Sequence, residues 1–507
     1  MMVKMEAGRR VALALVAALC CSLLITGVSG QSQPAVAIVG ATVIDGNGGS
    51  PQRDATLVVV GKRISAIGPR ASVTVPPGAQ VIDGSGKFVT PGFIDSNVHL
   101  SHYGAASPER YETLVRYQHR QPEVVLEAAQ LHLRRGVTTV RDSYGQLMPL
   151  MQIRDAIARG QEVGPRMLVA GNIVGWGGPF SISFGLIRDA GLTLFQEQMN
   201  DALAQGVGEE LMDMTPDEVR VAINKYLDKG PNFIKFGGTS HFSSPTFIGF
   251  SPEAQKAIVE ETHSRGLIAE THSTTIEGLR LSVLAGVDLI QHPEVLTGRE
   301  YPDSLVQLLR DRKVICSLHT KGSTGESWQR ARERAAAAKK EATKSEVSRP
   351  KTMAELRRER SALGVDGETR RLNEQKLIQG GCIVSIGTDN YWDAAPEFRR
   401  APMPANQEHG LGTIIAIEGL VELGMTPSQA IVAATKHGAM AAKGLAEFGT
   451  LEVGKYADLV LLDADPLASI SNIRRVRTVM KEGRLIDPQT LPDKPIFTPR
   501  RPATSNQ

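Results

Sequence analysis

The sequence predicts an α/β protein: a TIM-type (β/α)8 barrel with a small β-sandwich domain built from both chain ends. Three observations predict this fold. Strand-like runs alternate with amphipathic helical stretches eight times between residues 92 and 448, and eight such alternations are typical of a parallel barrel. Short β-like runs with turns occupy residues 31–91, and the same texture returns in residues 449–490. A chain of 507 residues is long enough for two or more domains.

The first thirty residues are expected to lie outside the fold. Basic residues precede an apolar run from Val11 to Val28, and Ser29-Gly30 offers compact residues before Gln31. This order is typical of a secretory signal peptide, so we expect an exported protein, periplasmic or secreted. The apolar run is long for a signal peptide, and an uncleaved N-terminal anchor is the alternative.

The small domain is expected to use residues 31–91 for its first half and residues 449–490 for its second half. The strand-like runs of the first half are 37–39, 42–44, 57–60 and 64–67, and turn residues such as Asp45-Gly46 separate them. Those of the second half are 456–462, 476–480 and 485–486. Residues 491–507 form an irregular tail in this prediction.

The barrel is expected to span residues 92–448. Its eight predicted strands are 93–100, 136–140, 167–170, 233–236, 267–269, 287–290, 314–316 and 383–386. A charged, alanine-rich insertion follows the seventh strand at residues 321–365. It predicts a helical excursion, which is either a solvated hairpin or a lid over the barrel mouth.

Composition limits the classes of partner. Hydrophobic residues make up 41% of the chain and charged residues 22%, which allows an ordinary globular core. The net charge of +3 gives no reason to expect a polyanionic partner, and no nucleic-acid-binding motif is present, so the expected partner is a small-molecule substrate. Cys316 and Cys382 lie in apolar runs and are expected to be buried free thiols. After removal of the signal peptide no membrane segment is expected, and a homo-oligomer is left open.

The first barrel strand carries the segment around which the site is predicted. Alternate residues of a strand share a face, so Asp95, Asn97 and His99 are expected to point the same way. Barrels bind metal ions in this manner, with side chains at i and i+2 of one strand. Taken alone, an Asn-x-His pair is typical of ordinary core residues, so the other strands decide its meaning.

Five polar residues lie at or near the C-terminal ends of predicted strands, where the catalytic residues of a barrel gather. They are His99, Lys235, His272, His292 and Asp389. Imidazole nitrogens and carboxylate oxygens are ligands for zinc and similar ions. A lysine ammonium has no lone pair and cannot be a ligand. A lysine carbamylated by carbon dioxide can, because the product is a carboxylate that is able to bridge two ions.

Several segments resemble the amidohydrolase superfamily, in its imidazolonepropionase-like and prolidase-like (Xaa-Pro dipeptidase-type) branch. The resemblance covers nearly all of residues 35–490. The segments that carry it are Pro91-Gly92-Phe93-Ile94-Asp95, Gly136-Val137-Thr138-Thr139-Val140-Arg141-Asp142, Phe233-Ile234-Lys235, Ala285-Gly286-Val287 with Ile290-Gln291-His292, Ile386-Gly387-Thr388-Asp389, and Gly449-Thr450-Leu451-Glu452-Val453-Gly454-Lys455-Tyr456-Ala457-Asp458-Leu459-Val460.

The resemblance implies a metal-dependent hydrolase that cleaves an amide or related C–N bond in a dipeptide, an N-acyl amino acid or a cyclic amide. It implies one or two divalent ions, most simply zinc, that activate a water. His272 and His292 would hold one ion, His99 and Asp389 the other, and carbamylated Lys235 would bridge them. Asp389 would also move the proton from the water to the leaving amine.

The sequence departs from the family pattern in three places. The first strand normally offers His-x-His, and Asn97 stands at the first of these positions as a weak or lost ligand. Glu270 precedes His272 by two residues where a small apolar residue is usual, and we expect it to be a buried carboxylate paired with a neighbour such as an arginine. Gly177-Gly178-Pro179 follows the third strand where relatives often have a histidine.

Further polar residues follow the predicted strands and are candidates for substrate contacts. They are Tyr144, His241, His319 and Tyr391. Each is equally consistent with an ordinary packing role. His102 follows His99 by three residues, so strand geometry turns it to the other face.

Two functions from different classes are consistent with these residues. The first is the metal-dependent hydrolase. The second is a catalytically impaired barrel that acts as a binding protein, and Asn97 is the residue that favours it. Since an amide offers only a neutral carbonyl oxygen, the half-site with Asn97 is expected to bind its ion more weakly than the other half-site.

Overall fold

The fold is taken from a computed structural model, which describes residues 35–104, 107–181, 183, 191–241, 246–294, 299–344 and 367–493. The predicted signal peptide, residues 345–366 of the insertion and nearly all of the predicted tail lie outside the described residues.

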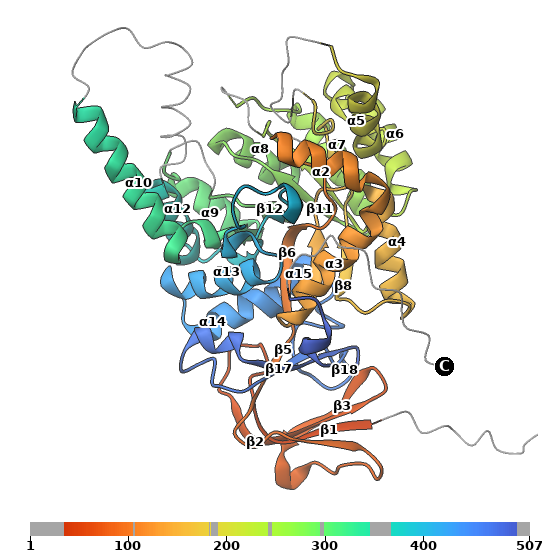
Figure 1. Ribbon diagram of the computed structural model, residues 1–507, viewed down its shortest axis with the longest axis vertical. Helices are drawn as coiled ribbons and strands as arrows, with labels where there is room; N and C mark the ends of the chain where they lie inside the picture. Colours follow the sequence, from red (N-terminus) through yellow and green to blue (C-terminus); the bar gives the residue numbers. More distant parts are fainter. Residues whose placement is uncertain are drawn as a thin grey trace, which may run out of the picture.

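Parallel strands form a closed barrel at the centre of the molecule (Figure 1). The barrel strands are β6 (Phe93–His99), β7 (Val137–Asp142), β8 (Arg166–Val169), β9 (Ile173–Val174), β10 (Phe233–Gly237), β11 (Ile268–His272), β12 (Leu289–Gln291), β13 (Ile315–Leu318), β14 (Ile383–Ile386) and β15 (Asn390–Tyr391). One run of paired strands has the order β15-β6-β7-β8, and the other has the order β9-β10-β11-β12-β13-β14. Three residues join β8 to β9, and three join β14 to β15, so each of these pairs continues as one barrel strand. The ten segments therefore make eight strands, and the two runs close one ring. The predicted fold class is confirmed.

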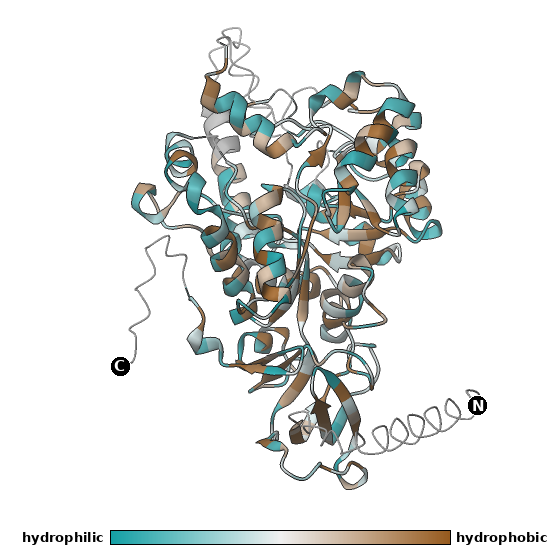
Figure 2. Ribbon diagram, turned by 90° about the vertical axis from the view of Figure 1, so that its right-hand side faces the viewer, coloured by the Kyte–Doolittle hydropathy of each residue, from teal (hydrophilic) through white to brown (hydrophobic). Residues whose placement is uncertain are grey.

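Helices lie around the barrel, and all those named here except α10 contribute buried side chains. They are α2 (Pro108–Tyr117), α3 (Gln121–Arg134), α4 (Leu147–Ala158), α5 (Leu194–Ala204), α6 (Pro216–Leu227), α7 (Pro252–Ser264), α8 (Ile276–Ala285), α9 (Asp303–Asp311), α10 (Gly325–Lys344), α12 (Gly367–Gln379), α13 (Leu411–Glu422), α14 (Pro427–Val432) and α15 (Gly438–Ala441). Figure 2 shows apolar segments at the centre and polar segments on many outer helix faces. Local signals fix several helix starts: Thr193 with Gln196 and Thr215 with Glu218 form capping boxes at α5 and α6.

The small β domain combines strands from both halves of the chain. Its strands are β1 (Ala35–Val43), β2 (Gln52–Val60), β3 (Arg63–Pro69), β4 (Gln80–Asp83), β5 (Phe88–Pro91), β16 (Leu459–Leu462), β17 (Val476–Lys481) and β18 (Arg484–Ile486). β5 pairs antiparallel with β16, which joins the two halves in one hydrogen-bonded sheet. β1 pairs first with β4 and then with β5, and the change of partner falls at Gly40, whose φ is +80°. The sheet folds around its own core, which includes Ile38, Leu57 and Leu459.

The connection between the two domains places the barrel mouth. Only Gly92 separates β5 from β6, so the small domain lies at the N-terminal ends of the barrel strands. A Cβ atom at position 92 would lie 2.1 Å from Oγ1 of Thr138, so this close approach requires glycine. The C-terminal strand ends therefore face away from the small domain, toward the upper part of Figure 1.

The predicted insertion begins as a helix beside the mouth. After β13 a short turn leads into α10, which projects away from the barrel (Figure 1). Residues 329–337 of α10 are exposed, and Trp328 contacts Arg371 of α12 at 5.5 Å between ring centroid and Cζ. This described part matches the solvated-helix alternative, and the lid alternative depends on residues outside the described ones.

Two smaller predictions concern the core and the membrane. Cys316 and Cys382 are buried and free, as expected. Within the described ranges, no helix is both long and apolar enough to cross a membrane.

Candidate active site

The predicted site residues come together at the C-terminal ends of the barrel strands. Asn97, His99, Lys235, His272 and His292 are all at least 95% buried. Strand pairing sets Gly237 beside His272 and His272 beside Gln291, so β10, β11 and β12 deliver Lys235, His272 and His292 to adjacent positions.

Asp389 occupies a strained turn between β14 and β15. Its φ is +54°, in the left-handed region that a non-glycine residue rarely adopts. His292 has a φ of +34°. Such strain persists where the surrounding structure holds it, and it is common at functional sites.

The first group of contacts centres on the Asp389 carboxylate. Oδ1 of Asp389 lies 2.8 Å from Nε2 of His99 and accepts a hydrogen bond of 3.2 Å from Nδ2 of Asn97. Asn97 and His99 therefore share a face of β6, as the sequence predicted.

The other nitrogen of His99 faces the backbone. Nδ1 of His99 lies 3.0 Å from the carbonyl oxygen of Tyr144, which can only accept. Nδ1 of His99 therefore carries a proton. Burial lowers the pKa of His99, and the hydrogen bond to Asp389 opposes that shift. A ring whose Nδ1 proton is held by a carbonyl leaves Nε2 as the atom available to a metal ion.

Ser143 connects the first group to Lys235. The Ser143 hydroxyl donates to the side-chain oxygen of Asn97, and the Lys235 ammonium donates to Ser143 Oγ at 3.1 Å. Burial lowers the pKa of Lys235, while the charge of Asp389 opposes the shift. Asn97 thus uses its only metal-binding atom, the amide oxygen, in a protein contact.

His272 and His292 form the second group. Nδ1 of His272 lies 3.1 Å from Nε2 of His292, so one ring donates to the other. Nε2 of His272 and Nδ1 of His292 are buried and have no hydrogen-bond partner among the residues that the structure describes. Burial lowers the pKa of His292 to about 4 and holds that of His272 well below its ordinary value, so both rings are neutral at pH 7. A neutral imidazole is the form that binds metal ions.

The Asp389 carboxylate remains ionised in this setting. Burial alone would raise the pKa of Asp389, but the hydrogen bond with His99 outweighs it. The pKa of Asp389 therefore lies well below the ordinary value of an aspartic acid.

The donor atoms of the site fit a divalent ion if Lys235 is converted to a carboxylate. Across the residues that the structure describes, no three His, Cys, Asp or Glu side chains are grouped to hold one ion. The site offers two pairs, His99 with Asp389 and His272 with His292. The unpartnered buried nitrogens are donors of the right chemistry. A third strong donor for either pair has to come from Lys235, which binds metal only as a carboxylate.

An aromatic wall borders the site. Trp176, on the loop after β9, lies edge-on to His272 at 4.7 Å and to His241 at 5.0 Å between ring centroids. Tyr144 packs against Tyr103 at 4.6 Å and against His99 at 6.1 Å. The wall is therefore in direct contact with three of the predicted site histidines.

The four candidate substrate contacts all lie near the mouth. Tyr144 belongs to the aromatic wall, and the ring of His241 lies 5.1 Å from that of His272. Nε2 of His319 is buried, and no described residue forms a hydrogen bond with it. The hydroxyl of Tyr391 accepts a hydrogen bond of 3.3 Å from Arg110. These positions are compatible with contacts to a substrate, and a role in substrate binding stays a prediction for all four residues.

Glu270 forms an ion pair below the site, as predicted. Oε2 of Glu270 lies 2.7 Å from Nη2 of Arg141, and both side chains are fully buried. Oε1 accepts a hydrogen bond of 3.0 Å from Gln291, and the guanidinium of Arg141 lies 4.0 Å above the ring of Phe233. Glu270 is therefore part of the barrel interior.

One orientation predicted from strand periodicity is wrong. Asp95 does not share the face of Asn97 and His99: its Oδ2 accepts hydrogen bonds from Thr388 at 2.8 Å and from Thr413 of α13 at 2.7 Å. The register of β6 against β7 shifts between Asp95 and Val98, and such a bulge breaks the alternation of side chains. His102 points away from the site, as expected, with Nε2 lying 3.1 Å from the carbonyl oxygen of Arg110.

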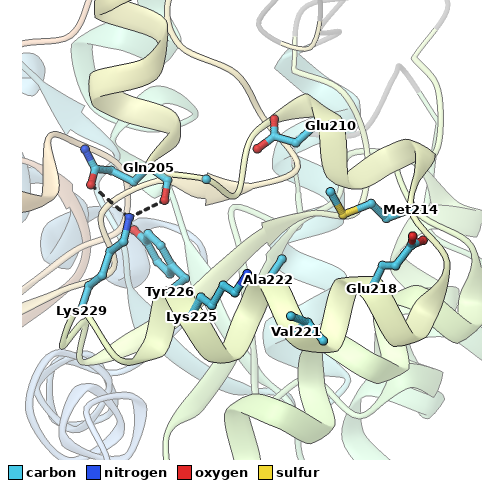
Figure 3. A pocket seen from close by; sticks show the side chains of 10 residues that line it. Gln205, Glu210, Met214, Glu218, Val221, Ala222, Lys225, Tyr226 and Lys229 are labelled. Carbon is cyan, nitrogen blue, oxygen red and sulfur yellow. Dashed lines mark hydrogen bonds between the residues drawn. The ribbon is translucent and has the colours of Figure 1, made fainter.

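A surface groove of about 580 Å³ lies away from this chemistry (Figure 3). It is lined by residues of α6 and of the segment before it, among them Glu218, Lys225 and Lys229. Lys229 donates to the backbone oxygen of Gln205 at 2.5 Å across one end of the groove. None of its lining residues belongs to the site.

Comparison with known proteins defines the class. Residues 88–486 match the Amidohydrolase family, and the chain belongs to that family. Members of this superfamily generally use one or two divalent metal ions. The ochratoxinase of Aspergillus niger is 24% identical over 490 residues, which cover 90% of this chain and 88% of the relative. The imidazolonepropionase of Brevibacillus brevis is 24% identical over 437 residues, covering 80% and 83%.

Solved structures agree with this assignment. Molinate hydrolase superposes with a TM-score of 0.78 at 29% identity over 94% of this chain and 99% of its own. Phenylurea hydrolase B has the same TM-score at 31% identity over 92% and 100%. A Xaa-Pro dipeptidase has a TM-score of 0.66 at 22% identity over 89% and 100%, which is evidence for the fold. The chain is thus an amidohydrolase, a hydrolase acting on C–N bonds, as its sequence motifs predicted.

Proposed function

We propose that this chain is a metal-dependent hydrolase in which Asp389 acts as the general base and acid. The observation that carries the proposal is the convergence of His99, Lys235, His272, His292 and Asp389 on one buried site at the C-terminal ends of the barrel strands. Catalytic residues of this fold gather at that position.

The residues divide the work as follows. His272 and His292 would hold one ion and His99 with Asp389 the other, and zinc suits these nitrogen and oxygen donors. A divalent ion bound there lowers the pKa of a water and polarises the substrate carbonyl. Asp389, ionised and hydrogen-bonded to His99, takes the proton of the attacking water and delivers it to the leaving nitrogen.

Carbamylated Lys235 supplies the bridging carboxylate in this proposal. Carbon dioxide reacts with a neutral amine, forming a C–N bond with release of one proton. Burial lowers the pKa of Lys235, which favours the neutral amine. The position of Lys235 between Ser143 and the histidines supports the same role.

Two groups of substrates are candidates for this site. The first consists of dipeptides, N-acyl amino acids and cyclic amides. The second consists of phenylureas and molinate, the compounds named for two similar structures, and two contacts favour it. Arg110 and Arg370 are guanidinium groups near the mouth, and each already pairs with a carboxylate, Asp393 at 2.6 Å and Glu294 at 3.0 Å. A carboxylate-bearing substrate would have to compete with Asp393 or Glu294 for these guanidinium groups. The likeness to phenylurea hydrolase B and molinate hydrolase supports the second group.

The alternative of a catalytically impaired binding protein rests on Asn97. Its amide oxygen accepts from Ser143, so it contributes little to an ion in this arrangement. The site nevertheless keeps five of the six predicted positions, which favours the enzyme.

Metal analysis of the purified chain, combined with hydrolysis of a panel of substrates, tests the proposal. The panel contains dipeptides, N-acyl amino acids, cyclic amides, phenylureas and molinate. We expect at least one tightly bound transition metal and hydrolysis within one group. A chain that binds no such metal after loading in bicarbonate would refute the hydrolase.

Export is part of the same proposal. The apolar run from Val11 to Val28 supports a cleaved signal peptide and a periplasmic or secreted location. N-terminal mass spectrometry of the native protein is expected to find Gln31 first. A native chain that retains the apolar run would instead be anchored.

A further inference from the structure

The turn that carries Asp389 is held from both sides by buried polar groups. Thr388 and Asn390 flank Asp389, whose φ of +54° requires support from its surroundings. The backbone N–H of Asp389 donates to the carbonyl oxygen of Asn97 at 2.8 Å. That contact connects the turn to β6, and other groups hold Thr388 and Asn390 at its two ends.

Asp95 holds the first end. Oδ1 of Asp95 accepts a hydrogen bond of 3.1 Å from the backbone N–H of Thr388, and Oδ2 accepts one of 2.8 Å from its hydroxyl. Oδ2 also accepts from Thr413 of α13 at 2.7 Å. One carboxylate thus ties the turn to the helical layer.

Lys321 holds the second end. It lies just after β13, its side chain is fully buried, and its ammonium donates to the side-chain oxygen of Asn390 and, at 3.0 Å, to that of Gln407. The other side of the Asn390 amide donates to the carbonyl oxygen of Glu408 at 2.7 Å. Asn390 also packs so tightly against α13 that a Cβ atom at Gly412 would lie 2.3 Å from its Nδ2.

The contacts of Lys321 are unusual for a buried lysine. Among the described residues, no carboxylate forms an ion pair with its ammonium, whose partners are two amide oxygens. Removing a lysine from water without a direct ion pair is costly. An apolar side chain would fill this position at lower cost if the position served packing alone.

We infer that Lys321 is a positioning residue for Asp389, acting through Asn390. The inference rests on the proposed role of Asp389 as ligand and general base. By fixing Asn390, Lys321 keeps the left-handed turn closed and the Asp389 carboxylate directed toward His99. Groups one contact removed from a metal ligand commonly alter metal affinity 10- to 100-fold when they are lost.

Cobalt binding by the full chain tests this inference. The metal-free protein, prepared in bicarbonate buffer, is titrated with Co²⁺ alone, and the visible absorption of the bound ion is recorded. The variants are Lys321→Met, Asn390→Ala and Asp389→Ala. Lys481→Met is the matched control, because Lys481 is also buried but pairs with Glu482 at 2.6 Å in β17, in the small domain.

We expect Lys321→Met to weaken Co²⁺ binding at the half-site of His99 and Asp389 by about 10- to 100-fold and to change the absorption of that ion. Asn390→Ala removes the side chain that Lys321 contacts, so it should weaken Co²⁺ binding to the same extent. Lys481→Met should bind Co²⁺ like the unmodified chain. If Lys321→Met does not fold, Asn390→Ala decides alone.

Two results separate this inference from its premise. If Asp389→Ala weakens Co²⁺ binding while Lys321→Met and Asn390→Ala retain the affinity and spectrum of the unmodified chain, the positioning role is overturned and the hydrolase stands. If the unmodified chain binds no Co²⁺, or Asp389→Ala binds it equally well, the proposed function fails and the inference fails with it.

Discussion

Replacing Glu270 by glutamine should destabilise the barrel strongly. The carboxylate of Glu270 lies 2.7 Å from the guanidinium of Arg141, and neither side chain is exposed. An arginine cannot lose its proton in a protein, so Glu270→Gln leaves an uncompensated buried charge. Breaking a buried pair in this way costs about 3–5 kcal/mol. Because glutamine keeps the shape of the side chain and can still accept from Gln291, we expect the lower end, about 3 kcal/mol.

Urea unfolding followed by tryptophan fluorescence measures this loss, since Trp176 and Trp392 are buried in the barrel. Glu277→Gln is the control, because Glu277 pairs with Arg280 at 2.6 Å while the two side chains are 53% and 46% exposed. Exposed helical pairs contribute roughly 0.3–0.5 kcal/mol.

A second variant removes both charges of the buried pair. Arg141→Met combined with Glu270→Leu should recover most of the stability, because well-packed apolar side chains often replace a buried ion pair without loss. Such comparisons resolve about 0.5 kcal/mol. If the losses of unfolding free energy in Glu270→Gln and Glu277→Gln differ by less than this, the assignment of a fully buried ion pair inside the barrel is wrong.

Three further outcomes follow from the site. Asn97→His should raise the weaker of the two metal affinities and bring occupancy toward two ions, as measured by titration; equal, tight binding of two ions by the unmodified chain would contradict this. Lys235→Ala should lose activity, and a short-chain carboxylic acid should restore part of it; full activity without the acid would eliminate the bridging role. Burial lowers the pKa of Lys321 to about 7, whereas an unfolded lysine titrates near about 10.4. Between these values the unfolded state binds more protons, so the free energy of unfolding should rise with pH, by at most about 1.4 kcal/mol per unit. Urea unfolding at pH 7 and pH 9 should show this rise in the unmodified chain and a smaller one in Lys321→Met.

Much of the fold could be predicted because it depends on local pattern. The eight barrel strands follow short apolar runs whose lengths and spacing the chain displays directly, and the strand ends carry the site histidines. The Arg141–Glu270 pair could also be anticipated in kind. A carboxylate two residues before His272 on a buried strand has to find a cation inside the barrel.

What could not be predicted depends on irregular backbone and on contacts between distant segments. The bulge in β6 turns Asp95 away from Asn97, and strict alternation cannot reveal a bulge. Ser143 lies one residue past β7, and nothing in its neighbourhood marks it as the link between Asn97 and Lys235. The contact of Trp176 with His272 likewise arises only when the loop after β9 reaches past β10 to β11. Lys321 belongs to a segment that sequence alone assigns to a solvated insertion, yet its side chain is fully buried.

The pairing of β5 with β16 has a consequence for synthesis on the ribosome. β5 ends at Pro91 and its partner begins at Leu459, so more than 360 residues must be made before this edge is covered. At about 5–20 residues per second the wait is roughly 20 to 70 s. During that time β5 presents unpaired backbone groups, which are templates for pairing with other chains. The nascent chain is therefore a natural client for chaperones until its last strands emerge.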